Sequence, residues 1–124
     1  MPRILVIEDN QANMKLACLL LANAGHTALC ATDAESGLTM ARTERPDLIL
    51  MDIQLPGMDG LAATALLKGD PETSSIPVIA LTAMAMKADK ERSQMAGCDA
   101  YIAKPLRYLE LYQTIDALLG LDRA

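Results

Sequence analysis

Three carboxylates, one hydroxyl and one amine stand directly after short apolar runs of this chain. Glu8 and Asp9 follow one run, and Asp52, Thr82 and Lys104 each follow another. A carboxylate can attack phosphorus and form an aspartyl phosphate. Acids that lie close together repel one another, and Mg²⁺, which prefers oxygen ligands, relieves that repulsion. Because a hydroxyl and an ammonium group can hold phosphoryl oxygens, the set is suited to metal-assisted phosphoryl transfer onto Asp52.

Each of these residues also has an ordinary explanation when it is taken alone. An Asp near a strand end is more often a turn former, and Glu8-Asp9 can simply favour a helix N-terminus through the helix dipole. Thr82 can cap a helix, and a lone Lys104 is usually a solvated surface residue. These explanations do not account for an acid, a hydroxyl and a cation that each follow a separate short strand.

The apolar runs predict the strands that must position these side chains. The run from Leu48 to Met51 lies between Pro46 and Pro56-Gly57, which is typical of a strand buried on both faces. Asp52 would then stand at the carboxyl end of an interior strand, where open α/β sheets place their ligand crevices. Strands are expected over residues 3–7, 26–31, 48–51, 76–81 and 100–103.

Helical segments alternate with these strands. They are expected over residues 11–24, 34–42, 60–68 and 84–96, with a last helix that ends near residue 119. Asp33 and Asp59 are placed to cap the second and third helices, and Gly25 to end the first. Five strands that alternate with five helices predict a doubly wound α/β fold, a parallel sheet with helices on both faces.

Apolar spacing predicts which side of each helix faces the sheet. In the first helix the expected core residues are Leu16, Ala17, Leu20 and Ala24. A second apolar stripe beside them consists of Met14, Cys18 and Leu21. The second helix turns Ala34, Leu38 and Ala41 inward, and the last helix is expected to bury Leu109, Tyr112, Ile115 and Leu119.

Composition limits the class of protein. The 124 residues suit one domain, with no internal repeat and no segment left over for an output domain. A net charge of −5 argues against direct nucleic-acid binding. The N-terminal apolar run is too short for a secretory signal and no run could cross a membrane, so we expect a cytoplasmic protein. Cys18, Cys30 and Cys98 are widely spaced, which favours reduced packing thiols over disulfides or zinc ligands.

Over essentially its whole length the chain resembles the receiver domains of two-component response regulators. The resemblance rests on Glu8-Asp9, Met51-Asp52, Pro56-Gly57-Met58-Asp59-Gly60, Thr82-Ala83, Tyr101 and Lys104-Pro105. It implies a flavodoxin-like three-layer sandwich with strand order 2-1-3-4-5, which makes the first and third strands neighbours. Within the family the chain is similar to single-domain regulators of bacterial cell division. That similarity rests on residues 13–16, 46–56, 82–87 and 97–102.

The resemblance also implies how the acids act. Asp52 would accept the phosphoryl group from a phosphohistidine of a histidine kinase or a histidine phosphotransfer protein. Asp9, Asp52 and the backbone carbonyl of Gln54 would bind Mg²⁺, or Mn²⁺ in its place, and Glu8 would act through a bound water. Such a chain is not classed as an enzyme, although it assists its own phosphorylation and dephosphorylation.

The remaining motif residues would hold the phosphoryl group and report its presence. Thr82 and Lys104 would contact phosphoryl oxygens, and Tyr101 would swing inward when Thr82 moves. The peptide bond between Lys104 and Pro105 would be cis, which helps to aim the lysine side chain. The family resemblance thus makes Thr82 and Tyr101 the switch residues.

A receiver without an output domain must signal by binding another protein. The family surface that changes on phosphorylation covers the fourth helix, fifth strand and fifth helix, here with Lys87, Lys90 and Tyr101; a solvated charged face is the other interpretation. We also expect a kinase or phosphotransfer helix to dock on Met14, Cys18 and Leu21; the other interpretation is extra core or scattered surface apolar residues. A downstream protein target, no membrane insertion, and a monomer or weak dimer complete the expectation, with a role in cell-cycle or cell-polarity control.

Three other functions compete with this one. A haloacid-dehalogenase-type phosphatase needs an acid two residues after its nucleophile, where this chain has Gln54. A flavin mononucleotide carrier needs a phosphate-binding loop after the first strand, where Glu8-Asp9 would repel phosphate. A phosphorylation-independent adaptor with a receiver fold stays open, because the sequence does not reveal what a surface binds.

Overall fold

The structure is a computed structural model that describes residues 2–82, 91, 94 and 96–121. The described residues form five strands and four helices. In chain order these are β1 (Arg3–Ile7), α1 (Gln11–Asn23), β2 (Thr27–Ala31), α2 (Ala34–Glu44), β3 (Leu48–Asp52), α3 (Gly60–Gly69), β4 (Val78–Thr82), β5 (Ala100–Ala103) and α5 (Tyr108–Leu119). The helix predicted over residues 84–96 lies, apart from three single positions, outside the described residues.

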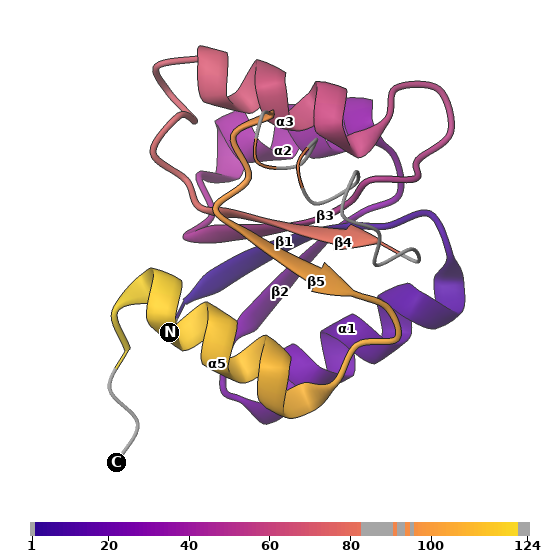
Figure 1. Cartoon of the computed structure of the whole chain (residues 1–124), viewed down its shortest axis with the longest axis vertical. Helices are drawn as coiled ribbons and strands as arrows, with labels where there is room; N and C mark the ends of the chain where they lie inside the picture. The colour runs from indigo at the N-terminus through magenta and orange to yellow at the C-terminus, as the bar shows by residue number, and fades with distance from the viewer. Residues whose placement is uncertain (1, 83–90, 92–93, 95, 122–124) are drawn as a thin grey trace.

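The five strands form one parallel sheet in the order β2-β1-β3-β4-β5. Helices α2 and α3 cover one face of the sheet, and α1 and α5 cover the other (Figure 1). The predicted doubly wound, three-layer α/β fold and its strand order are therefore confirmed. In this order β1 lies beside β3, with Ile7 opposite Met51, so the segments that follow the two strands emerge together.

Strand β3 is buried on both faces, as its continuous apolar sequence predicts. All five of its residues are buried, and Leu48 to Met51 have no exposed surface. Alternate side chains enter different cores: Ile49 and Met51 pack with residues of α2 and α3, and Leu48 and Leu50 with residues of α1 and α5. Two cores therefore hold the strand that ends in Asp52.

The predicted element boundaries agree closely with the structure, and the differences are small. Helix α2 continues two residues beyond the predicted end. Strand β2 begins at Thr27, and β4 begins after Pro77, whose missing N–H suits a position before the strand. Thr82 therefore belongs to β4 instead of following it.

Side-chain caps begin three of the helices. The Asn13 N–H donates to the Asn10 side chain at 3.0 Å, which caps α1. Asp33 accepts from the Ser36 N–H at 2.7 Å, and Asp59 from the Ala62 N–H at 2.8 Å. The predicted caps of α2 and α3 are thus confirmed. Gly25 follows α1 with φ +84°, as the predicted helix end requires.

The predicted inner face of α1 is wrong in part. Ala17 is buried as predicted, but Leu16 is 37% exposed, and Leu21 of the second stripe has no exposed surface. Leu19 is 59% exposed. The helix carries leucine on most of its sides, so the direction in which it meets the sheet decides which leucines are covered.

The inner face of α5 also differs from the prediction at one residue. Ile115 is buried as predicted, but Leu111 is the second fully buried residue of the helix, and Leu109 is 58% exposed. Leu109 is two residues from Leu111 and therefore lies on nearly the opposite side of the helix. Tyr112 is half-buried, and its hydroxyl donates to the Leu20 carbonyl at 2.7 Å, which joins α5 to α1. No helix in the described part of the chain has the length and apolar character needed to cross a membrane.

Candidate functional site

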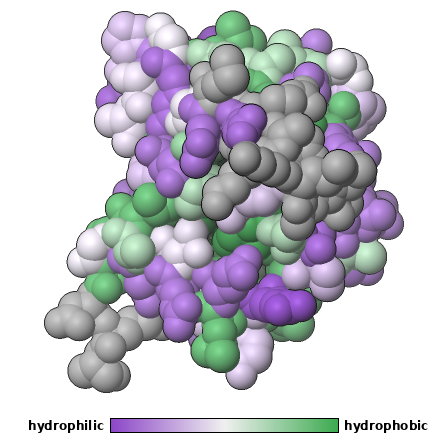
Figure 2. All heavy atoms as spheres, in the orientation of Figure 1, coloured by the Kyte–Doolittle hydropathy of each residue, from purple (hydrophilic) through white to green (hydrophobic). Residues whose placement is uncertain are grey.

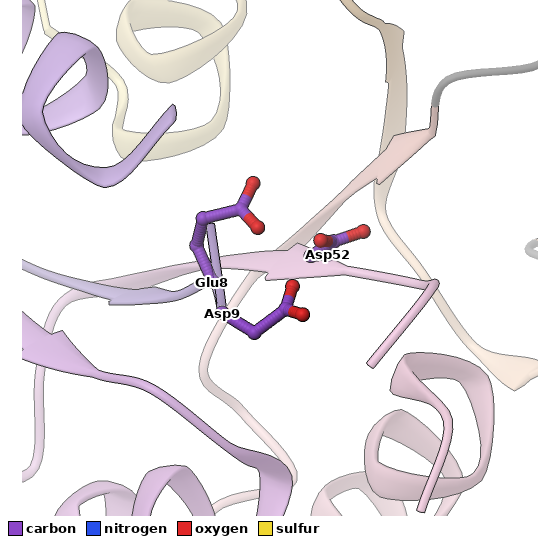
Figure 3. A group of neighbouring side chains, drawn as sticks. All are labelled: Glu8, Asp9 and Asp52. Atoms are coloured by element: carbon purple, nitrogen blue, oxygen red, sulfur yellow. The ribbon is translucent and has the colours of Figure 1, made fainter. Parts of the chain in front are cut away.

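Three acids meet where β1 and β3 end side by side. One carboxylate oxygen from each of Glu8, Asp9 and Asp52 lies within 4.8 Å of the others (Figure 3). Glu8 and Asp52 are each 2% exposed, and Asp9 is exposed. The parallel order of the strands thus brings together acids that are more than forty positions apart in the sequence. Buried carboxylates require partners, because their removal from water is unfavourable.

Lys104 supplies one partner for both buried acids. Its Nζ lies 2.6 Å from Glu8 Oε1 and 3.1 Å from Asp52 Oδ2. Burial would lower the pKa of Lys104, but the hydrogen bonds and charges of Glu8 and Asp52 outweigh burial and raise that pKa. The lysine is therefore a cation, and three carboxylates against one ammonium leave the cluster with excess negative charge.

Backbone N–H groups hold the other oxygens of the two buried acids. The Gln54 N–H donates to Asp52 Oδ1 at 2.9 Å, and the Asn10 N–H donates to Glu8 Oε2 at 3.2 Å. Each buried carboxylate therefore has one oxygen on Lys104 and the other on the backbone two residues further along the chain. This pattern fixes the orientation of both carboxylates.

Thr82 and Lys104 lie at the ends of the next two strands. Thr82 is the last residue of β4 and has no exposed surface, and its strand pairs with β3 so that Asp52 stands opposite Leu81. The Lys104 N–H donates to the Thr82 carbonyl at 2.6 Å, which joins the ends of β4 and β5. The peptide bond between Lys104 and Pro105 is cis, as the resemblance implies. The hydroxyl and the amine thus lie at the same edge of the sheet as the acids.

Tyr101 lies on β5, further back along the sheet. It is half-buried and packs against a small cluster formed by Ile53, Leu61 and Ala80. Ile53 belongs to this cluster and is the residue directly after Asp52. The Tyr101 ring therefore packs against a cluster that includes the neighbour of the acid. Lys87 and Lys90, which were expected to belong to the partner surface, lie outside the described residues.

The predicted docking stripe on α1 is not a continuous surface. Leu21 is fully buried, Cys18 is half-buried, and Met14 is half-buried and packs against the core. Docking through Leu21 is therefore excluded, because the sheet already covers this side chain. The large exposed apolar residues of α1 are instead Leu16 and Leu19.

Sequence reasoning assigned no role in the site to two residues that the structure places there. Asn10 both caps α1 and donates its N–H to Glu8, and an Asn at a helix N-cap was the signal for it. Gly60 begins α3 directly against the backbone of β3. A Cβ at Gly60 would overlap the Asp52 carbonyl oxygen and lie 2.7 Å from Ile53 Cα. The signal here was a glycine one residue after the cap Asp59.

Comparison with known proteins identifies relatives along the whole chain. A sequence model of the response regulator receiver domain matches residues 4–116. The polar-differentiation response regulator DivK of Brucella anthropi is 47% identical over 121 residues, which cover 97% of this chain and 98% of that protein. DivK of Brucella ovis is 46% identical over 117 residues, or 94% of this chain and 95% of that protein.

Solved structures resemble the fold equally closely. A response regulator structure from Chloroflexus aurantiacus has a TM-score of 0.93 at 28% identity, over 96% of this chain and 98% of its own. The receiver domain of a sensor histidine kinase from Pseudomonas aeruginosa has a TM-score of 0.90 at 34% identity, over the same shares of the two chains. That domain holds a magnesium ion coordinated in its active-site cleft.

Proposed function

The chain belongs to the response regulator receiver family, and from that premise we propose that it is a stand-alone regulator phosphorylated on Asp52. Membership of the family implies interaction with histidine kinases or phosphotransfer proteins and with downstream targets. The observation that carries the proposal is the setting of Asp52, a buried carboxylate at the end of the central strand, beside two further acids and Lys104. The similarity to DivK over nearly all of both chains supports the stand-alone form.

The donor set of the site fits Mg²⁺. The groups within reach are hard carboxylate oxygens, and their charge exceeds that of Lys104, which suits a divalent cation that binds through few carboxylates. We assign Asp9, Asp52 and the Gln54 carbonyl as ligands of Mg²⁺ or Mn²⁺, with Glu8 acting through a water. When bound, the ion supplies positive charge beside the phosphoryl oxygens.

Each residue of the site has its own role in phosphoryl transfer. A carboxylate oxygen of Asp52 forms a bond to phosphorus while the bond between phosphorus and the donor's histidine nitrogen breaks. Lys104, whose Nζ already contacts Asp52 at 3.1 Å, binds one phosphoryl oxygen, and the Thr82 hydroxyl donates to another. The backbone N–H of Gln54 keeps the nucleophile oriented. The chain thus accepts a phosphoryl group from its donor in signalling.

The output is a change in protein binding. Thr82 moves toward the phosphoryl group, Tyr101 turns inward from β5, and the binding surface around β5 and α5 changes. The similarity to a polar-differentiation regulator supports a role in cell-cycle or cell-polarity control. We place the protein in the cytoplasm, where the donor kinases expose their phosphohistidines.

Phosphorylation by a small donor tests this function. The protein is incubated with acetyl phosphate and Mg²⁺, and its intact mass is measured at once. We expect the wild type to gain one phosphoryl group and Asp52→Asn to gain none. Asp33→Asn is the matched control, because Asn also caps a helix and Asp33 lies outside the acidic cluster. It should be phosphorylated like the wild type.

Omission of Mg²⁺ tests the metal assignment in the same assay. We expect no phosphoryl gain in EDTA, and Asp9→Asn should need far more Mg²⁺ than the wild type. A wild type that gains no phosphoryl mass and shows no Mg²⁺-dependent change with beryllofluoride would overturn the proposal. That result would favour the phosphorylation-independent adaptor.

A further inference from the structure

Two cysteines that are distant in the sequence are in contact in the fold. Cys18 lies in the middle of α1 and Cys30 near the end of β2, the edge strand of the sheet. Their Sγ atoms are 3.1 Å apart. A disulfide bond is about 2.05 Å long, so only a small approach of the two side chains separates contact from a covalent bond. The wide sequence spacing concealed this pair.

The two sulfur atoms differ in their access to solvent. Cys30, on the edge strand β2, is exposed, and Cys18 is half-buried. Burial and the contact with Cys30 raise the pKa of Cys18 to about 12, so Cys18 keeps its proton at neutral pH. An oxidant in solution therefore reaches Cys30 first, with a second thiol already beside it.

Cys18 and Cys30 do not belong to a candidate metal site in the described part of the chain. A structural zinc ion takes four ligands, usually Cys and His. Within the described ranges, Glu8, Asp9 and Asp52 form the one group of three or more candidate ligands, and neither Cys18 nor Cys30 belongs to it. The chemistry left to the pair is that of two adjacent thiols.

We propose that Cys18 and Cys30 form a peroxide-sensitive site in which oxidation joins α1 to β2 by a disulfide bond. The Cys30 sulfur attacks one oxygen of hydrogen peroxide, the O–O bond breaks, and Cys30 becomes a sulfenic acid as water leaves. The Cys18 sulfur then attacks the Cys30 sulfur, and the S–O bond breaks. The Cys18 proton leaves with that oxygen as a second water, so two thiols and one peroxide give one disulfide and two waters.

The bond would restrain a helix that begins next to the acidic cluster. Helix α1 starts at Gln11, two residues after Asp9, and carries the exposed Leu16 and Leu19. A link from its middle to β2 fixes the helix against the edge strand, and thiol reductants reverse the link. The site uses no residue of the phosphorylation chemistry, so it stands or falls independently of Asp52.

Peptide mapping of the oxidised full chain tests the proposal. Reduced protein is treated with hydrogen peroxide, free thiols are blocked with N-ethylmaleimide, and the digest is analysed by mass spectrometry. We expect a linked pair of peptides that contain Cys18 and Cys30, with two hydrogen atoms lost, and its disappearance with dithiothreitol. Cys98 is the internal control, because it packs against the core on the α2–α3 side of the sheet, away from the Cys18–Cys30 pair, and should remain a thiol.

Single substitutions separate the two steps. In Cys18→Ala the reaction should stop at a Cys30 sulfenic acid, which dimedone traps, and in Cys30→Ala Cys18 should stay open to maleimide after denaturation. Circular dichroism checks that both variants are folded. The proposal fails if wild-type Cys18 and Cys30 both remain alkylatable, if Cys30 links two chains, or if Cys30 proceeds to sulfinic acid without the internal bond.

Discussion

At the scale of single residues, Lys104 balances the charge of the site. Its Nζ is the shared partner of Glu8 and Asp52, at 2.6 and 3.1 Å, and its side chain is 17% exposed. Two buried carboxylates without such a partner would be strongly unfavourable. Sequence reasoning assigned Lys104 to the phosphoryl group alone. The structure shows that the same ammonium also makes the burial of the acids tolerable.

Replacement of this lysine should destabilise the fold in a pH-dependent way. Lys104→Met removes the cation and leaves two buried carboxylates, so in EDTA at neutral pH we expect a loss on the order of 3 kcal/mol in the free energy of unfolding. Because folding raises the pKa of Lys104 above 10.5, its stabilisation is fully present below that pH and disappears as the pH rises through the raised pKa. The difference between wild type and Lys104→Met should therefore shrink above about pH 10.5.

Urea unfolding at a series of pH values measures this difference. Lys15→Met is the control, because Lys15 is an exposed residue of α1 and its loss should change stability little at any pH. Equal stability of Lys104→Met and wild type at neutral pH would contradict the electrostatic role. A difference that grows above pH 10.5 would contradict it as well.

At the scale of elements, the strands, the caps of α2 and α3 and the buried face of α2 (Ala34, Leu38 and Ala41) were predictable, but the inner faces of α1 and α5 were predicted only in part. The run that became β3 was predicted as a strand buried on both faces, which is confirmed, and Asp33 and Asp59 cap helices as expected. Helix α1 is apolar on most sides, so its periodicity did not decide between Leu16 and Leu21 as the inward residue. The answer depends on how the helix lies on the sheet, which is a tertiary property.

The contact of α3 with β3 predicts a strong effect of one methyl group. Gly60→Ala would place a Cβ against the Asp52 carbonyl oxygen and Ile53 Cα, and backbone atoms cannot move aside as a flexible side chain can. We expect a loss of about 1–3 kcal/mol in the free energy of unfolding, as for other overpacked sites. Since relief of the overlap must shift Asp52 or α3, phosphorylation by acetyl phosphate should also slow.

Gly69→Ala is the matched control in the same helix. A Cβ at Gly69 meets no atom within 4 Å. Alanine also limits the unfolded chain more than glycine does, so Gly69→Ala should leave stability unchanged or raise it slightly. Chemical unfolding and the acetyl phosphate assay compare the two variants. If Gly60→Ala matched Gly69→Ala in both stability and phosphorylation rate, neither property would depend on close packing of α3 against the backbone of Asp52.

At the scale of the whole molecule, the acidic cluster was predictable because parallel strands end at one edge, but the exposed apolar surface was not. Much of that surface lies on the α1 and α5 side, where Leu16 is 37%, Leu19 59%, Tyr108 57% and Leu109 58% exposed. Hydrophobic side chains reach the surface among hydrophilic ones in the region of α5, in the lower part of Figure 2. A groove between the two helices is lined by Leu16, Leu20, Leu106, Arg107, Tyr108, Leu109, Glu110 and Gln113.

This groove lies next to the phosphorylation site. Leu16 and Leu106 also line a small cavity that reaches Glu8 and Lys104. A helix of a phosphotransfer protein seated in the groove would therefore bring its phosphohistidine close to Asp52. We therefore propose docking in this groove, with α1 as one of its walls, in place of the predicted stripe that included Leu21.

A charge placed in the groove should separate the two routes of phosphorylation. Leu16→Glu should slow transfer from a phosphorylated histidine phosphotransfer protein about tenfold, the factor that roughly 1.4 kcal/mol of lost binding free energy produces. Phosphorylation by acetyl phosphate needs no docking and should keep its rate. Leu66→Glu is the control, since Leu66 is 50% exposed on α3 across the sheet and should leave both rates unchanged. Equal slowing of both donors by Leu16→Glu would indicate damage to the site, and equal rates for Leu16→Glu and wild type would exclude docking on this face.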